Sequence, residues 1–249
     1  MRAIVILALI IGSTPLQAAP VRKAATKVAP KSAPSPKAVP SVLYDFKGVP
    51  LEISLNEFRA RAHPDGSGNA KTICTGEKIK RFSSMTEPYQ VSIYDDVEKS
   101  LGVVKCVWVA ANENKGTYTY AGDVVSLELA GSGYVSNDYS FSFIKDPKDG
   151  VMRLYEIEAV SNRNAFNDVV QGLTGKWGAP KLVNDTVQNK MGATFPQVTA
   201  IWSNPAATIT PLERWSKVDE MILLVVDTRL SELVSTAKSA KRASIPNAI

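Results

Sequence analysis

Histidine and cysteine are scarce in this chain of 249 residues, which contains one His and two Cys. A closed zinc site needs several ligands of these two types, so the composition nearly excludes one, and we expect neither a metal nor a cofactor. Common catalytic motifs are absent as well, including G-x-S-x-G, the phosphate loop G-x-x-x-x-G-K-[ST] and G-x-G-x-x-G. These absences exclude several enzyme classes but assign no function.

Acidic residues are missing from residues 1–40, which hold six Lys or Arg. Residues 41–237 carry 20 basic and 24 acidic side chains, a net charge of −4, so the formal charge of +5 belongs to the ends of the chain. The folded part therefore lacks the basic surface of a nucleic-acid-binding domain, and no recognition motif accompanies it. We expect no nucleic-acid partner.

Residues 1–18 have the pattern of a cleavable secretory signal peptide. Arg2 is followed by a nine-residue apolar run, 3–11, and Ala18 places a small residue before the expected cut. A membrane-spanning helix needs about 20 apolar residues, so we expect no transmembrane segment in the mature chain. The pattern predicts a periplasmic or secreted protein.

Residues 19–41 are rich in Pro, Ala and Lys and predict a disordered linker. Five prolines and five basic residues lie in 20–40 without any apolar periodicity that would mark a core face. The positive charge suggests attraction to an anionic envelope component, and a plain soluble spacer is the alternative. Residues 243–249 are expected to form a flexible tail.

Cys74 and Cys106 are the two thiols that an oxidising compartment would pair. Their disulfide would close a loop and so stabilise the folded chain by roughly 3–4 kcal/mol in the chain-entropy model. The alternative, a catalytic thiol, would need His63 as its base, and no spacing in the sequence places that histidine beside either cysteine.

Residues 42–242 predict an α+β domain, a mainly antiparallel sheet with helices packed on one face. Ser54 and Glu57 form a capping box before a short helix. Apolar residues at helical spacing predict two further helices, over 164–177 and from about 229. Period-two alternation predicts strands in 103–110, 118–129, 139–143 and 155–159, where Glu156 and Glu158 mark a solvated face. Further strands are expected near 198–203, 208–212 and 221–226.

Two stretches in which a helix precedes several strands suggest pseudo-repeated halves. Residues 46–58 and the helix ending in Trp177-Gly178-Ala179-Pro180 resemble segments of uncharacterised exported bacterial proteins. The halves are similar to the β-lactamase-inhibitor-like fold, whose members bind proteins rather than catalyse. That resemblance implies a protein-binding role, although the signal region lacks the lipidated Cys of the small lipoproteins that share the fold.

Two sets of residues are candidates for binding. Arg59, Arg61, His63 and Asp65 lie at the end of the first helix and predict a polar site, with an exposed loop as the alternative. Tyr118, Tyr120 and Trp215 have the residue types that anchor protein interfaces.

We therefore expect an exported, non-enzymatic protein that binds a protein partner or an envelope component. Two alternatives remain open. One is a secreted hydrolase that uses paired carboxylates or His63, and the other is an envelope structural factor held by its basic linker.

Overall fold

The computed structural model describes residues 43–79, 89–93, 95–112 and 122–243, all within one compact unit, Pro40–Ile249. The predicted signal peptide and linker lie outside the described residues. So do residues 244–249 of the tail and two of the candidate contact residues, Tyr118 and Tyr120.

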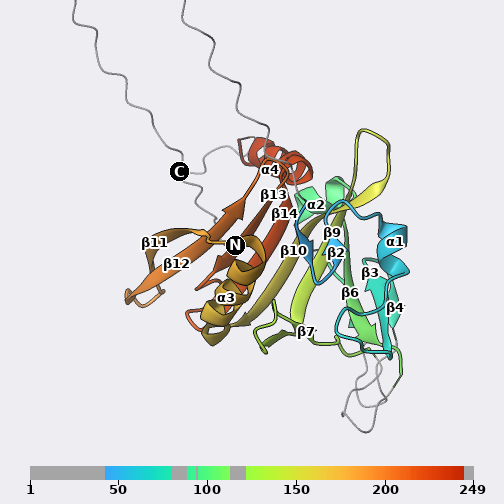
Figure 1. The fold of residues 1–249 in the computed structure, drawn as a ribbon. Coiled ribbons are helices and arrows are strands. Elements are labelled where there is room, and N and C mark those ends of the chain that lie inside the picture. Colours follow the sequence, from blue (N-terminus) through green and yellow to red (C-terminus); the bar gives the residue numbers. More distant parts are fainter. Residues whose placement is uncertain (1–42, 80–88, 94, 113–121, 244–249) are drawn as a thin grey trace, which may run out of the picture. The chain divides into compact units, whose positions relative to one another are not determined.

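Eight strands form one antiparallel sheet. They are β3 (Ala70–Cys74), β6 (Val104–Ala110), β9 (Asp138–Lys145), β10 (Met152–Asn162), β11 (Lys181–Gln188), β12 (Thr194–Ser203), β13 (Ala207–Leu212) and β14 (Glu220–Asp227). Their order is β11-β12-β13-β14-β10-β9-β6-β3 (Figure 1). This arrangement confirms the predicted α+β class, and the strand order does not show two repeated halves.

Shorter elements complete the described part. Three two-stranded ribbons pair β1 (Asp45–Phe46) with β2 (Val49–Pro50), β4 (Lys78–Ile79) with β5 (Tyr89–Gln90), and β7 (Leu127–Glu128) with β8 (Val135–Ser136). The helices are α1 (Leu55–Arg59), α2 (Asp96–Ser100), α3 (Phe166–Trp177), preceded by a 3-10 turn at Arg163–Ala165, and α4 (Thr228–Ala243). The predicted capping box of α1 is present, with Ser54 and Glu57 bonded in both directions.

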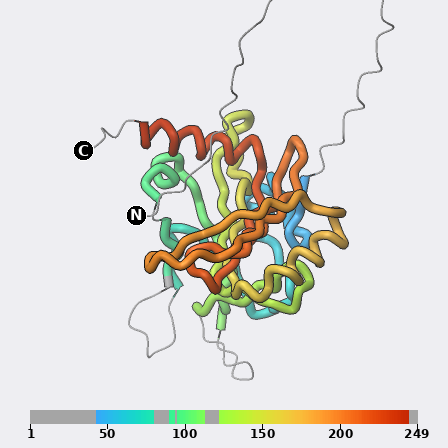
Figure 2. The backbone as a smooth tube through the Cα atoms, turned by 90° about the vertical axis from the view of Figure 1, so that its left-hand side faces the viewer, coloured from blue at the N-terminus to red at the C-terminus, as the bar shows by residue number. Residues whose placement is uncertain are grey.

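The helices lie on both faces of the sheet. Phe143 and Ile144 are consecutive in β9, so their side chains point to opposite faces. Phe143 belongs to the main core with buried residues of α1 and α3, whereas Ile144 packs with Leu230 and Val234 of α4. The expectation of helices on a single face therefore holds for α1 and α3, whereas α4 covers the other face. Figure 2 shows α4, in red, on the opposite side of the sheet from α3.

A β-bulge supplies apolar surface for α4. Leu154 and Glu156 of β10 pair with the consecutive residues Phe143 and Ser142, which leaves Tyr155 as an extra residue. Tyr155 accordingly joins the smaller apolar cluster under α4 rather than the main core. The alternation in the sequence placed Tyr155 on the same face as Ile157, and the bulge is the physical reason for the difference.

The two cysteines are cross-strand partners. Cys74 in β3 lies opposite Cys106 in β6, and their Sγ atoms are 2.03 Å apart, which confirms the predicted disulfide. Both residues are fully buried at the end of the sheet formed by β3. The bond therefore fastens an edge strand to its neighbour.

Candidate functional site

The polar residues predicted at the end of α1 each have a structural partner. Arg59 pairs with Glu77 at 2.7 Å, and Arg61 donates to the carbonyl of Gly48 at 2.7 Å. Asp65 forms an ion pair with Lys47 and accepts the N–H of Glu128 at 2.8 Å. These contacts favour a role in fixing loops.

His63 is buried, with only 3% of its surface exposed. Its Nδ1 accepts the backbone N–H of Asp65, and its ring stands edge-on to Trp108. Burial lowers the pKa of His63, and the neighbouring Lys47 lowers it further against the opposing effect of Asp65. The neutral ring packs edge-on against Trp108 within the core, which weakens its case as a general base.

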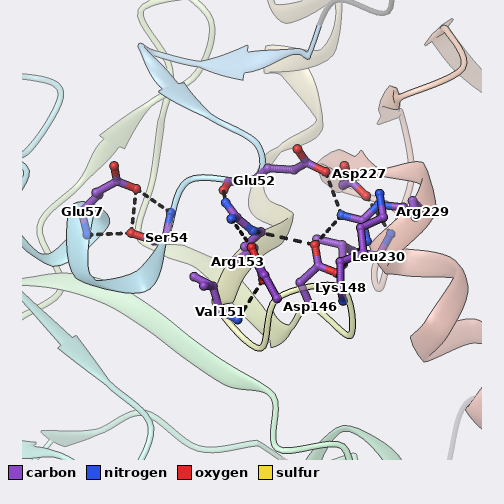
Figure 3. A network of polar contacts seen from close by, with 11 residues as sticks. Glu52, Ser54, Glu57, Asp146, Lys148, Val151, Arg153, Asp227, Arg229 and Leu230 are labelled. Atoms are coloured by element: carbon purple, nitrogen blue, oxygen red, sulfur yellow. Dashed lines mark hydrogen bonds and ion pairs between the residues drawn. The ribbon is translucent and has the colours of Figure 1, made fainter.

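Around the start of α4, a dense polar network clamps three segments together (Figure 3). The Arg229 guanidinium donates to both oxygens of Asp146, at 2.9 and 2.7 Å, and to Glu52 at 2.9 Å. Its hydrogen bonds lower the pKa of the buried Asp146 carboxyl to about 2. Asp227 caps the helix by accepting the N–H of Leu230 at 2.7 Å. The network fixes where α4 begins over the sheet.

A cavity of about 500 Å³ lies beside α4. Its floor comes from β10 through Tyr155 and Glu156. The helix contributes its other wall, formed by Thr228, Ser231, Glu232, Val234, Ser235 and Lys238. Because Ser231, Ser235 and Lys238 are spaced by three and four residues, they lie on one side of the helix.

Lys238 of the cavity wall belongs to a cluster of charged residues from three elements. Lys238 pairs with Glu98 of α2 at 2.6 Å and with Asp95 at 3.2 Å, and Lys105 of β6 pairs with the same Glu98 at 3.2 Å. Burial raises the pKa of Glu156 to about 7, with Lys105 opposing the rise. Burial also raises the pKa of Glu158 on the same face. The face predicted to be solvated is thus partly buried, and one of its carboxyls titrates near neutrality.

The β11–β12 hairpin presents a second candidate surface at the opposite end of the sheet from β3 (Figure 1). Every residue of β11 except Val187 is exposed, including the apolar Leu182 and Val183. At the hairpin tip Met191 is 93% exposed. Asn189 Oδ1 orders that tip by accepting the backbone N–H groups of Met191 and Ala193.

The hydrogen-bonding phase of the hairpin shows which groups of β11 face outward. The N–H of Asn189 donates to the carbonyl of Ala193 at 2.9 Å. Hydrogen-bonded and non-bonded residue pairs alternate along an antiparallel ladder, so the odd-numbered residues of β11 are the ones bonded to β12. In agreement, Val198 on β12 is turned away from β11, because its N–H and C=O bind Glu213. The even-numbered residues of β11 therefore direct their N–H and C=O groups to the outer edge.

Trp215, predicted as an interface residue, is 40% exposed. The preceding Arg214 lies over the ring of Phe195 in β12 and donates to the carbonyl of Pro196, so this segment adjoins the hairpin near its tip. Among the described residues, no hydrogen bond, ion pair or ring contact joins Trp215 to the group around His63. Of the second predicted set, Trp215 is the member that lies within the described residues, and the structure does not bring it to the group around His63.

Sequence reasoning missed both the cavity and the hairpin edge. The cavity joins Tyr155 and Glu156 of β10 to a helix more than 70 residues further along the chain, and no local pattern signals that contact. The usable signal was the pair Glu156 and Glu158, which alternate with the apolar residues Ile157 and Ala159. In β11 the sequence KLVNDTVQ lacks the alternation by which the other strands were predicted.

Comparison with family models, curated proteins and solved structures finds no match for this chain. Within the described ranges, no cluster of three or more His, Cys, Asp or Glu is placed to hold a metal ion. In the same part of the chain, every helix is too short or too polar to cross a membrane.

Proposed function

We propose that this chain is an exported, non-catalytic binding protein that takes an extended segment of a protein partner on the outer edge of β11. The observation that carries the proposal is an eight-residue edge strand with no neighbour on its outer side among the described strands. An edge row of N–H and C=O groups is a template for strand addition, and in this row the N–H of Thr186 already donates to the Asp185 carboxylate at 2.7 Å. Backbone bonds would supply affinity, and side-chain contacts would supply specificity.

Exposed apolar side chains near this edge support a protein partner. Leu182 is 55% exposed and Val183 is 40% exposed, so they flank the backbone groups on the two faces of the strand. Met191 and Trp215 add two residue types that are enriched at protein interfaces. Met191 is held at an ordered turn, so less conformational entropy is lost when it enters a partner's pocket.

Export is supported by the signal-like residues 1–18 together with the disulfide. The expected localisation is periplasmic or secreted. A protein partner fits the exposed strand better than an anionic envelope component does, because β11 carries one Lys and one Asp and has no net charge.

Substitution at Asn184 tests strand addition, because this residue directs its backbone groups outward. Asn184→Pro removes one outward N–H, whereas Asn184→Ala keeps it and changes only the side chain. In-cell crosslinking and co-purification of the full chain should recover a partner with the wild type and Asn184→Ala, but not with Asn184→Pro. Recovery of the same partner with all three would contradict the proposal.

A secreted hydrolase remains the second candidate, and Glu156 is the observation that favours it. A carboxyl with a pKa of about 7 can donate or accept a proton at neutral pH. Hydrolysis of chromogenic glycosides or esters by the wild type that is lost in Glu156→Gln would establish this function instead.

A further inference from the structure

Two carboxylates that form no direct ion pair among the described residues line the cavity beside α4. Glu156 lies on the floor, and Glu232 lies on the helix wall. Among the described residues neither forms an ion pair, and the nearest hydrogen-bonding group to Glu156 is the Ser142 hydroxyl at 3.5 Å. Lys238, the cation at the same cavity, is occupied by Glu98 and Asp95. The cavity therefore has an excess of negative charge.

A buried hydroxyl adds an independent observation. Tyr155 is 1% exposed and forms part of the cavity wall. Its phenolic oxygen makes no hydrogen bond within the described part of the chain. Burial raises the pKa of this tyrosine, and the nearby Ser142 hydroxyl opposes the rise. Buried polar atoms normally have a partner, so this oxygen is a place for a ligand donor.

The chemistry of the wall points to an organic cation. No metal-binding cluster occurs in the described ranges, so a metal ion is a poor fit. Tyr155 and Val234 add apolar surface to the lining that contains the two carboxylates, which suits a chain of methylene groups. A primary ammonium can donate to a carboxylate and to a phenolic oxygen at the same time.

We propose that this cavity binds a small linear aliphatic diamine. One ammonium group lies against Glu156 and the oxygen of Tyr155, and the other lies against Glu232 at the helix wall. Ser231 and Ser235 accept further hydrogen bonds along the helix. This site is separate from the outer edge of β11, so diamine binding can be tested independently of the proposed function.

Calorimetric titration of the purified full chain with diaminobutane tests the proposal, with aminobutane and butanediol as matched probes. At about pH 8 the diamine should bind, the monoamine should bind more weakly by about tenfold, and the uncharged diol should not bind. Glu156→Gln should weaken diamine binding by about tenfold or more. Glu158→Gln, on the same strand and face but outside the cavity lining, should change it by less than about twofold.

The pH dependence gives a further readout. The charged groups around Glu156 are Lys105, Glu158, Glu98 and Lys238. An alkylammonium stays protonated below about pH 10, so a rise in affinity between about pH 6 and pH 8 would report ionisation of Glu156. This rise should disappear in Glu156→Gln. Equal binding of diamine and diol, unchanged affinity in Glu156→Gln, or no binding at low ionic strength would overturn the proposal.

Discussion

In helix α3, Gly172 lies against the backbone of Ala130, and a Cβ built at Gly172 would stand 2.1 Å from the Ala130 carbonyl oxygen. That oxygen belongs to the backbone, so relief of the clash requires the helix or the loop to shift. Gly175, one turn further along the same helix, has open space around the equivalent position. The two glycines are therefore a matched pair.

We predict that Gly172→Ala destabilises the protein by about 1–3 kcal/mol, because the added methyl group overpacks the contact. Gly175→Ala should stabilise it by up to about 1 kcal/mol through helix propensity. Urea denaturation of both variants checks this pair. Equal effects of the two substitutions would contradict the close approach of α3 to Ala130.

Asp146 and Arg229 form a partly buried charge pair within the polar network. Arg229→Met leaves the Asp146 carboxylate, 3% exposed, without its main partner. We expect a loss of about 3 kcal/mol or more, whereas the double variant with Asp146→Asn should recover part of it. Measured unfolding free energies of the single and double variants test this coupling, and additive losses would contradict it.

The same pair predicts a pH dependence. The pKa of Asp146 is about 2 in the folded protein, below its ordinary value of 3.8. Its contribution is therefore fully present above about pH 4 and is lost as the pH falls through 2. Acid unfolding of Asp146→Asn should show a weaker dependence on pH over this window than the wild type shows. An unchanged dependence would mean that Asp146 is not the responsible group.

At the scale of elements, β11 combines two kinds of backbone position. Val183 directs its N–H and C=O toward β12, whereas the neighbouring Asn184 directs them outward. Val183→Pro should therefore break the ladder and destabilise the hairpin by about 2–3 kcal/mol, while Asn184→Pro should cost much less. Hydrogen exchange of β11 and β12 amides measures the difference. Equal loss of protection in the two variants would contradict the assignment of Val183 as bonded to β12 and Asn184 as facing outward.

Most elements could be predicted from local patterns. The capping box at Ser54, the alternating strands around Phe141 and Ile157, and the stripe of α3 all depend on neighbours a few residues apart. Strand β11 escaped prediction because its side chains are exposed on both faces, so burial imposes no period of two. Its pairing comes from the hairpin turn at Asn189.

The candidate sites were less predictable, for a related reason. The raised pKa of Glu156 depends on burial, and the cavity that it lines is closed by a helix distant in sequence. His63 was considered as a base on its reference pKa alone, whereas its burial against Trp108 lowers that pKa. Burial depends on the tertiary structure. The type of a residue could therefore suggest a chemical role, but it could not show where in the fold that residue is buried.

At the scale of the whole molecule, the disulfide fastens β3 to the remainder of the sheet. Cys74 and Cys106 are 32 residues apart, so breaking their bond should cost roughly 3–4 kcal/mol in the chain-entropy model. Urea denaturation with and without a reductant measures this cost. Alkylation of two thiols in the denatured, non-reduced protein would contradict the presence of the bond.

The central claim is that an exported form of this chain holds a protein partner at the β11–β12 hairpin. The most direct measurement is site-specific photo-crosslinking in living cells from Met191, with Leu233 of α4 as a second exposed apolar position. We predict a reproducible crosslink to one envelope or secreted protein from Met191 and none to that protein from Leu233. No crosslinked protein from Met191, or the same protein from both positions, would contradict the claim.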